Sequence, residues 1–252
     1  MVDNKDLFRT TEFDQWRLAS GVSAEEAILF DQFLEKDLSV LEAGTGGGRI
    51  LLALSSMGFG SLSGFDYTAD LIEQARRKQH AERIDFQVMD AEHLSYPSES
   101  FDRVLYLGQI LCVFDTEAAR QHAAKEAYRV LKPGGVALIS LLLMEFRSSQ
   151  FLYRVFLSYL KILRTLSRER RTVQSQPWLL QGGKPNLAAL LDRPPYIHWF
   201  TVPEALALMR GAGFTVNQIA TSTQLRAGVL SPPDADLPPF YPNDMFYIVC
   251  RK

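Results

Sequence analysis

The chain has 252 residues, 47% of them hydrophobic and 22% charged, and a net charge of −2. This is an ordinary globular composition without the basic surplus that would hold a protein on nucleic acid, so we expect no nucleic-acid partner. The two cysteines, Cys112 and Cys250, lie far apart and belong to no Cys/His cluster, so we expect neither a disulfide framework nor a metal site. The polar first ten residues and the lack of a long apolar run indicate a cytoplasmic protein.

Helix and strand signals alternate through the first 143 residues. A helical apolar spacing at 24–34 precedes a short apolar run at 38–41, a glycine cluster and an apolar helix at 50–57. The later elements are a strand at 61–65, a helix at 69–80, strands at 84–89 and 101–107, a helix at 116–131, a Pro133-Gly134-Gly135 turn and a strand at 136–143. Strands that alternate with helices predict βαβ units and a mostly parallel sheet with helices on both faces.

The alternation stops after residue 143. Residues 146–196 carry no strand signal, and a helix at 202–211, a strand at 214–225 and a last strand at 244–250 follow them. The segment at 146–200 therefore reads as an insertion into an α/β domain.

The glycine cluster carries the most information about function. A phosphate-binding P-loop would end in Gly-Lys-Ser/Thr, but the chain has Gly48-Arg49-Ile50. A dinucleotide site would place a glycine where Arg49 stands. The spacing Glu-x-Gly-x-Gly-x-Gly, from Glu42 to Gly48, instead resembles motif I of class I S-adenosylmethionine (SAM)-dependent methyltransferases. The resemblance implies that SAM is the cofactor and that its methionyl part lies against Glu42, Ala43, Gly44, Thr45 and Gly46.

The following strand ends extend this resemblance. Asp66, with Tyr67 beside it, is the expected acceptor for the ribose hydroxyls; a helix N-cap is the alternative role of Asp66, although Thr68 could cap that helix. The stretch Asp90-Ala91-Glu92, followed by Phe101-Asp102, resembles methyltransferases of the quinone-biosynthesis type. The resemblance implies an adenine contact at Asp90 and Ala91, whereas a turn residue is the structural alternative for Asp90. At the end of the next strand, the resemblance implies that Gly108 and Gln109 contact the methionyl end of SAM, whereas a polar turn residue is the structural alternative for Gln109.

The resemblance also implies the architecture. We expect a single SAM-dependent methyltransferase domain over residues 1–252, with a Rossmann-like seven-stranded sheet in the order 3-2-1-4-5-7-6 and the last strand antiparallel. Residues 1–36 would form N-terminal cap helices, and residues 146–200 a helical lid over the substrate.

The expected reaction is in-line transfer of the SAM methyl group to a small-molecule acceptor by O-, N- or C-methylation. We name His198 as the candidate base, although a buried histidine paired with the backbone is the structural alternative. A catalytically silent SAM- or nucleoside-binding scaffold or sensor is the rival reading. A nicotinamide-dependent oxidoreductase is disfavoured by Arg49.

Residues 148–171 form the other distinctive segment. Polar residues recur there every three or four positions, at Arg154, Ser158, Lys161, Thr165 and Arg168, between apolar ones. Residues 146–171 contain seven basic residues and one acidic residue. This amphipathic pattern fits a lid with basic residues outward, a peripheral membrane contact or a dimer contact, and leaves monomer and homodimer both open. A membrane contact would suit an apolar or aromatic acceptor.

Overall fold

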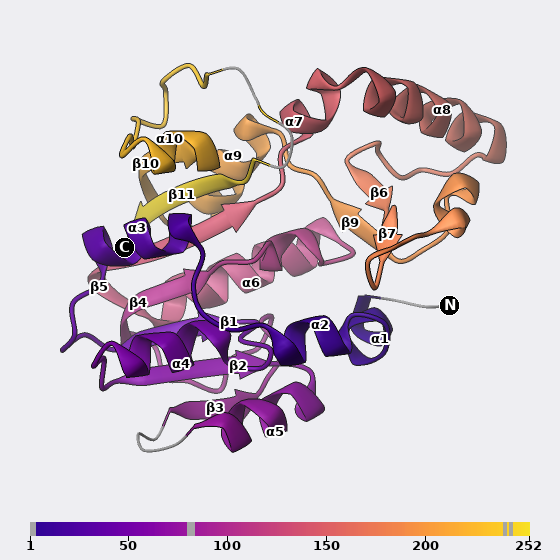
Figure 1. Ribbon diagram of the computed structural model, residues 1–252. Coiled ribbons are helices and arrows are strands. Elements are labelled where there is room, and N and C mark those ends of the chain that lie inside the picture. The colour runs from indigo at the N-terminus through magenta and orange to yellow at the C-terminus, as the bar shows by residue number, and fades with distance from the viewer. Residues whose placement is uncertain (1–3, 80–83, 239–240, 242–243) are drawn as a thin grey trace.

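The computed structural model describes residues 4–79, 84–238, 241 and 244–252. Figure 1 shows a central twisted sheet of seven strands in the order β10-β11-β5-β4-β1-β2-β3. The strands are β1 (Val40–Ala43), β2 (Leu62–Asp66), β3 (Asp85–Val88), β4 (Phe101–Tyr106), β5 (Leu131–Leu141), β10 (Thr215–Thr221) and β11 (Phe246–Arg251). With β10 and β11 counted as the sixth and seventh strands, the predicted order is confirmed, and β11 runs antiparallel to both neighbours.

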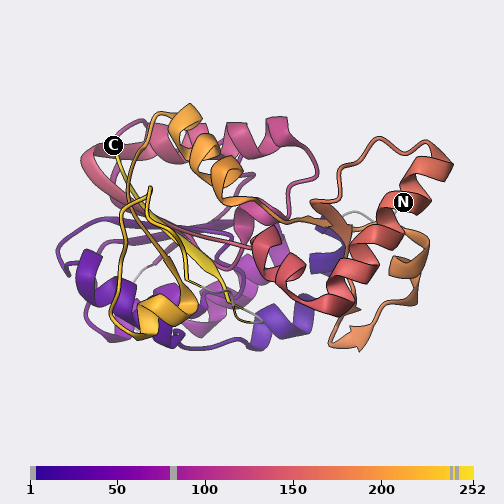
Figure 2. The same ribbon diagram turned by 90° about the horizontal axis from the view of Figure 1, so that it is seen from above.

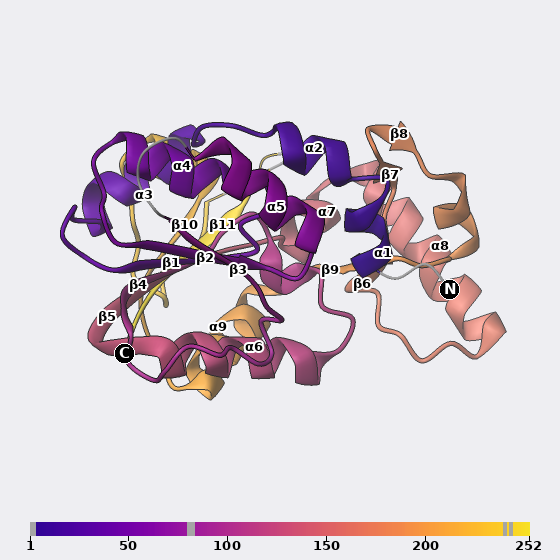
Figure 3. The same ribbon diagram turned by 90° about the horizontal axis from the view of Figure 1, so that it is seen from below.

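Helices cover both faces of the sheet (Figure 3). One face carries α3 (Ala24–Phe33), α4 (Arg49–Ser56), α5 (Ala69–Lys78) and α10 (Ser222–Arg226), and the other carries α6 (Glu117–Val130) and α9 (Val202–Ala212). Each face buries its own core: Leu51, Leu54 and Ile72 pack on the first, and Ala123, Ala127 and Met209 on the second. The last residue predicted for α5, position 80, lies outside the described residues.

One predicted turn falls inside a strand. Residues Pro133-Gly134-Gly135 lie within β5, which begins directly after α6 and shifts its register against β4 between Phe101 and Arg103. The amide of Gly134, which has a φ of +77°, donates to the Lys252 carbonyl at 3.0 Å. The Pro-Gly-Gly sequence therefore forms an irregularity at the start of β5, where the Gly134 amide bonds to the carbonyl of Lys252.

The predicted N-terminal cap contains helices α1 (Asn4–Arg9) and α2 (Phe13–Leu18) in addition to α3; residues 1–3 of it lie outside the described residues. The insertion contains α7 (Met144–Ser149), α8 (Phe151–Ser167), β6 (Ser175–Pro177), β7 (Leu180–Gln181), β8 (Lys184–Pro185), a 3-10 helix η2 (Leu187–Leu191) and β9 (Tyr196–His198). Figure 2 shows this insertion at one end of the molecule, beyond the sheet.

The prediction of no strand in 146–196 is wrong. Strand β6 pairs antiparallel with β9, and β7 pairs with β8. These strands have two or three residues each, too few for apolar alternation to be visible in the sequence. No helix in the described part of the chain is long and apolar enough to span a bilayer.

Candidate functional site

The glycine loop joins β1 to α4 and is closely packed at Gly44 and Gly48. A Cβ at Gly44, where φ is +61°, would lie 2.2 Å from the Ile110 side chain, and one at Gly48, where φ is +80°, 2.9 Å from Phe86. Gly48, one position before Arg49, therefore lets the start of α4 pack closely against its neighbours. Arg49 instead forms a two-pronged ion pair with Glu26 of α3, with distances of 2.5 and 2.7 Å.

Two buried carboxyl groups lie at the ends of β1 and β2. Glu42 accepts a hydrogen bond of 2.6 Å from the Thr45 hydroxyl, and burial raises its pKa to about 8. Asp66 accepts from the amides of Gly46 at 3.0 Å and Thr68 at 2.8 Å, and burial raises its pKa as well. Asp66 thus ties the glycine loop to the end of β2. The Thr68 side chain makes no cap hydrogen bond, so the expected capping by Thr68 is wrong.

These groups line one cavity of about 290 Å³ at the carboxyl ends of the strands. The structure brings nine predicted residues onto its wall, namely Glu42, Gly44, Thr45, Gly46, Asp66, Tyr67, Asp90, Ala91 and Gly108. The other two do not line it. Ala43 is buried in the core cluster that also contains α6 residues, and Gln109, at a φ of +69°, directs its amide toward the Met245 sulfur, 3.5 Å away.

The cavity wall is acidic. Among its described residues, the carboxyl-bearing ones are Glu42, Asp66, Asp90, Glu92 and Asp115. Arg49 is the one basic residue among them, and its guanidinium is paired with Glu26. Such a wall favours a ligand that carries positive charge and hydroxyl or amino donors over a doubly charged pyrophosphate.

The N-terminal helices close the cavity, with Asn4, Phe8, Trp16 and Ala19 on its wall. The buried Asn4 amide donates to the carbonyls of Val113 and Tyr196, both at 2.7 Å, and accepts from the indole of Trp178 at 3.1 Å. One side chain therefore joins α1 to the loop after β4 and to the insertion.

Further contacts hold the cap in place. The Phe8 ring meets the Trp178 ring edge-on at 6.0 Å, and Glu12 accepts from the Gly182 amide at 2.6 Å. Lys78 donates to the carbonyls of Gly47, at 3.2 Å, and Arg17. The sequence predicted the cap through the family resemblance, but the contact residues Asn4 and Trp178 were missed, because they are separated by 174 positions and share no local pattern.

The structure does not bring His198 to the cavity. Its Nε2 lies 2.7 Å from Glu204 Oε1, and its ring meets Phe200 edge-on at 4.6 Å. The histidine is buried, but its partner is a side chain of α9 rather than the backbone. Its catalytic role remains a prediction, and the contacts favour a role in fixing the start of α9.

The two parts of the predicted lid, α8 and the segment from Trp178 to Tyr196, lie differently relative to the cavity. Among the described residues that line the cavity, none belongs to residues 146–200, so neither α8 nor the rest of the insertion forms its wall. Arg154, Lys161 and Arg168 point outward as expected, but most apolar side chains of α8 are exposed as well. The part of the insertion that meets the cavity cap is the segment from Trp178 to Tyr196.

Comparison with known proteins agrees with this geometry. The family described as "Methyltransferase domain" matches residues 40–135. A demethylmenaquinone methyltransferase from Thermus thermophilus is 30% identical over 186 residues, which cover 70% of this chain and 74% of that protein. The ubiquinone/menaquinone biosynthesis C-methyltransferase UbiE of Geotalea daltonii is 31% identical over 133 residues, about half of each chain.

A SAM-dependent methyltransferase from Methanosarcina mazei has a similar structure, with a TM-score of 0.65 and 22% identity, covering 89% of this chain and 96% of that one. This likeness concerns the fold. Fold, glycine loop and sequence relatives together place the chain in a known class: it belongs to the class I SAM-dependent methyltransferases. The cofactor of this family is SAM.

Proposed function

We propose that the chain transfers the methyl group of SAM to a small apolar acceptor, with SAM held in the cavity at the strand ends. The acidic wall carries this proposal. SAM presents a sulfonium, an ammonium, a ribose diol and an adenine amino group, and each of these is positively charged or donates hydrogen bonds. A wall rich in carboxyl groups, whose basic Arg49 is already paired, fits that set.

The proposal assigns each of six wall residues to one part of SAM. Asp66 has a free lone pair on each oxygen besides its two amide bonds, so it can accept from both ribose hydroxyls. Glu42 faces the ammonium, and Asp90 accepts from the adenine amino group beside the Ala91 amide. Gly44 and Gly46 provide a side-chain-free wall for the methionyl part.

Bound SAM supplies a methyl group that is already activated by its positive sulfur. The chain then has to position the acceptor in line with the sulfur–methyl bond and exclude water. The cap of α1 and α2, tied down through Asn4, performs the exclusion. No histidine belongs to the described cavity wall, so an acceptor that ionises easily, such as a hydroquinone, fits better than an alcohol.

The acceptor side of the cavity is apolar. The apolar side chains that line the cavity are Phe8, Trp16, Ile110, Val113 and Phe114, and we assign to them the contact with the acceptor. The name of the Thermus relative specifies demethylmenaquinone, an apolar quinone, as the substrate of that protein. We therefore propose an apolar aromatic acceptor for this chain, with the segment from Trp178 to Tyr196 as its cover.

Transfer of labelled methyl groups tests the proposal. The purified chain is incubated with methyl-labelled SAM and, separately, a prenylated hydroquinone, a short phenol, an amine and a thiol. We expect label in the hydroquinone, and much less label with the Asp66→Asn variant when SAM is limiting. SAM binding without methylation of any acceptor would favour the silent SAM-binding scaffold instead.

A further inference from the structure

The insertion exposes an unusual amount of apolar surface. Ten of the fifteen large apolar side chains that are exposed in the described chain lie between residues 151 and 191. On α8 they include Leu152 at 79% exposure, Leu166 at 78% and Phe151 at 74%. We define the apolar face of the insertion as Phe151, Leu152, Val155, Tyr159, Ile162 and Leu166 of α8, together with the three exposed leucines of η2. A continuous apolar area of this kind marks a binding surface.

These side chains share one side of α8. Positions 151, 155, 162 and 166 follow the three- and four-residue spacing of one helix face, whereas the buried Leu160 and Arg164 lie on the opposite face. The Tyr159 hydroxyl donates to the Leu190 carbonyl at 2.5 Å, which joins α8 to η2. Leu187, Leu190 and Leu191 of η2 are between 51% and 76% exposed. The face is thus built from two elements.

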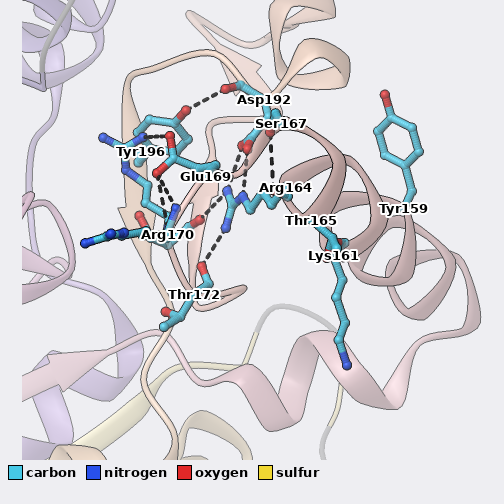
Figure 4. A network of polar contacts seen from close by, with 12 residues as sticks. Tyr159, Lys161, Arg164, Thr165, Ser167, Glu169, Arg170, Thr172, Asp192 and Tyr196 are labelled. Carbon is cyan, nitrogen blue, oxygen red and sulfur yellow. Dashed lines mark hydrogen bonds and ion pairs between the residues drawn. The ribbon is translucent and has the colours of Figure 1, made fainter.

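An internal ion pair fixes α8 in this orientation (Figure 4). The buried Arg164 binds both oxygens of Asp192, at 2.6 and 2.7 Å, and donates to the carbonyls of Thr172 and Ser175. Lys161 extends away from this network in Figure 4. Rotation of α8 to bury its apolar face would remove Arg164 from its partners, and an unpaired buried charge is strongly unfavourable.

The charge of the molecule is divided between its two parts. Residues 146–200 contain nine basic and two acidic residues, a net charge of +7, and the rest of the chain carries −9. Both acidic residues of the insertion are engaged within it: Asp192 pairs with Arg164, and Glu169 with Arg171. The exposed Arg154 and Lys161 flank the apolar face on α8. The insertion is therefore apolar at its centre and positive around it.

We propose that the apolar face of the insertion lies on an anionic lipid bilayer, with α8 in the plane of the interface. An exposed apolar stripe beside basic residues is the pattern of helices that bind at the headgroup level. A second copy of this chain is a poorer partner, because pairing two such faces would bring two insertions of charge +7 together. Nucleic acid would leave the apolar side chains uncovered.

Docking would also affect how the acceptor reaches the cavity, and this consequence alone rests on the proposed function. The cover segment from Trp178 to Tyr196 belongs to the same insertion and contacts Asn4 on the cavity wall. A docked insertion would therefore bring the cavity cap close to the bilayer. An apolar acceptor dissolved in lipid could then reach the cavity without crossing water.

Sedimentation with vesicles tests the proposal on the full chain. Phosphatidylcholine vesicles with and without phosphatidylglycerol are mixed with the protein at low and high salt. We expect sedimentation with the anionic vesicles and weaker binding to the neutral ones or at high salt. The variant I162E/L166E should bind at least about tenfold more weakly, and R154A/K161A about tenfold more weakly to anionic vesicles.

The control variant is M57E/V229E, which introduces the same two negative charges at exposed apolar residues outside the insertion. It should bind like the unmodified chain, and circular dichroism should confirm that every variant is folded. No sedimentation of folded protein, or sedimentation that I162E/L166E leaves unchanged, would overturn the proposal. A dimer in analytical ultracentrifugation that I162E/L166E dissociates would also overturn it, since the face would then belong to a second copy. Methyl transfer is not measured here, so the proposed function can fail separately.

Discussion

Among single residues, Glu42 combines complete burial with a raised pKa of about 8. At pH 7 most molecules without ligand therefore carry a protonated Glu42. The ammonium of SAM favours the charged carboxylate and lowers this pKa, so binding at pH 7 should release a proton, and affinity should rise as the pH increases from 6 toward 8. The buffer takes up the released proton, and Tris and phosphate do so with different enthalpies. The observed enthalpy of titration with SAM at pH 7 should therefore differ between the two buffers. The Glu42→Gln variant should show the same enthalpy in both buffers. Equal enthalpies in the unmodified chain would contradict the assignment of Glu42 to the SAM ammonium.

Asp66 provides a second prediction at this scale. In Asp66→Asn one oxygen becomes an amide NH2 group, which can no longer accept from a ribose hydroxyl or a backbone amide. We expect the Kd for SAM to rise about 10- to 100-fold, the usual value of a hydrogen bond to a charged group. The exposed Asp70→Asn, four residues further on, is the matched control and should bind normally. Unchanged affinity in Asp66→Asn would remove Asp66 from the ribose site.

The residue-scale predictions succeeded where a position is tied to the end of a strand. Glu42 is the second-last residue of β1, Asp66 ends β2, and Asp90 lies two positions after β3. Their place in the motif therefore also fixed their place in the cavity. Gln109 could not be placed this way, because its left-handed backbone turns the side chain toward Met245. Asn4 could not be found at all, since its partners come from three distant segments of the chain.

At the scale of elements, the apolar spacing predicted helix α8 but not which side of it would be buried. Both a core-facing and an exposed apolar stripe give the same periodicity. The side is decided by Arg164, which the sequence pattern did not single out and which pairs with Asp192 across 28 positions. A buried ion pair between distant residues leaves no local signal.

That ion pair can be tested directly. Arg164→Met leaves Asp192 buried without a partner and should cost about 3–5 kcal/mol of local stability. We expect faster amide hydrogen exchange throughout α8 and unchanged exchange in β4 and β5. Arg154→Met, at an exposed position of the same helix, should stay within about 0.5 kcal/mol of the unmodified chain. Equal exchange in both variants would mean that the ion pair does not hold α8.

The N-terminal cap gives a further prediction for an element. Asn4→Ala removes the hydrogen bonds to Val113, Tyr196 and Trp178, so α1 should open more often. SAM should dissociate about tenfold faster in stopped-flow displacement, while its association rate changes little. Gln15→Ala, an exposed change on α2, serves as the control. A dissociation rate unaffected by Asn4→Ala would show that α1 does not retain the cofactor.

At the scale of the whole molecule, the sheet order determines where the cavity lies. The chain reverses its direction of winding between β1 and β4, and ligands of open α/β sheets bind beyond the strand ends at such a point. The alternation of strands and helices predicted a parallel sheet, and the family resemblance supplied its order. The short strands of the insertion were not visible in the sequence, because they form through contacts within the folded insertion.

The central claim is that this cavity binds SAM, and calorimetric titration of the purified chain with SAM, S-adenosylhomocysteine and NAD in parallel tests it most directly. The acidic wall and the paired Arg49 predict binding of SAM and S-adenosylhomocysteine at one site per chain, with no measurable binding of NAD. Folded protein that binds neither SAM nor S-adenosylhomocysteine, or that binds NAD in their place, would contradict the account.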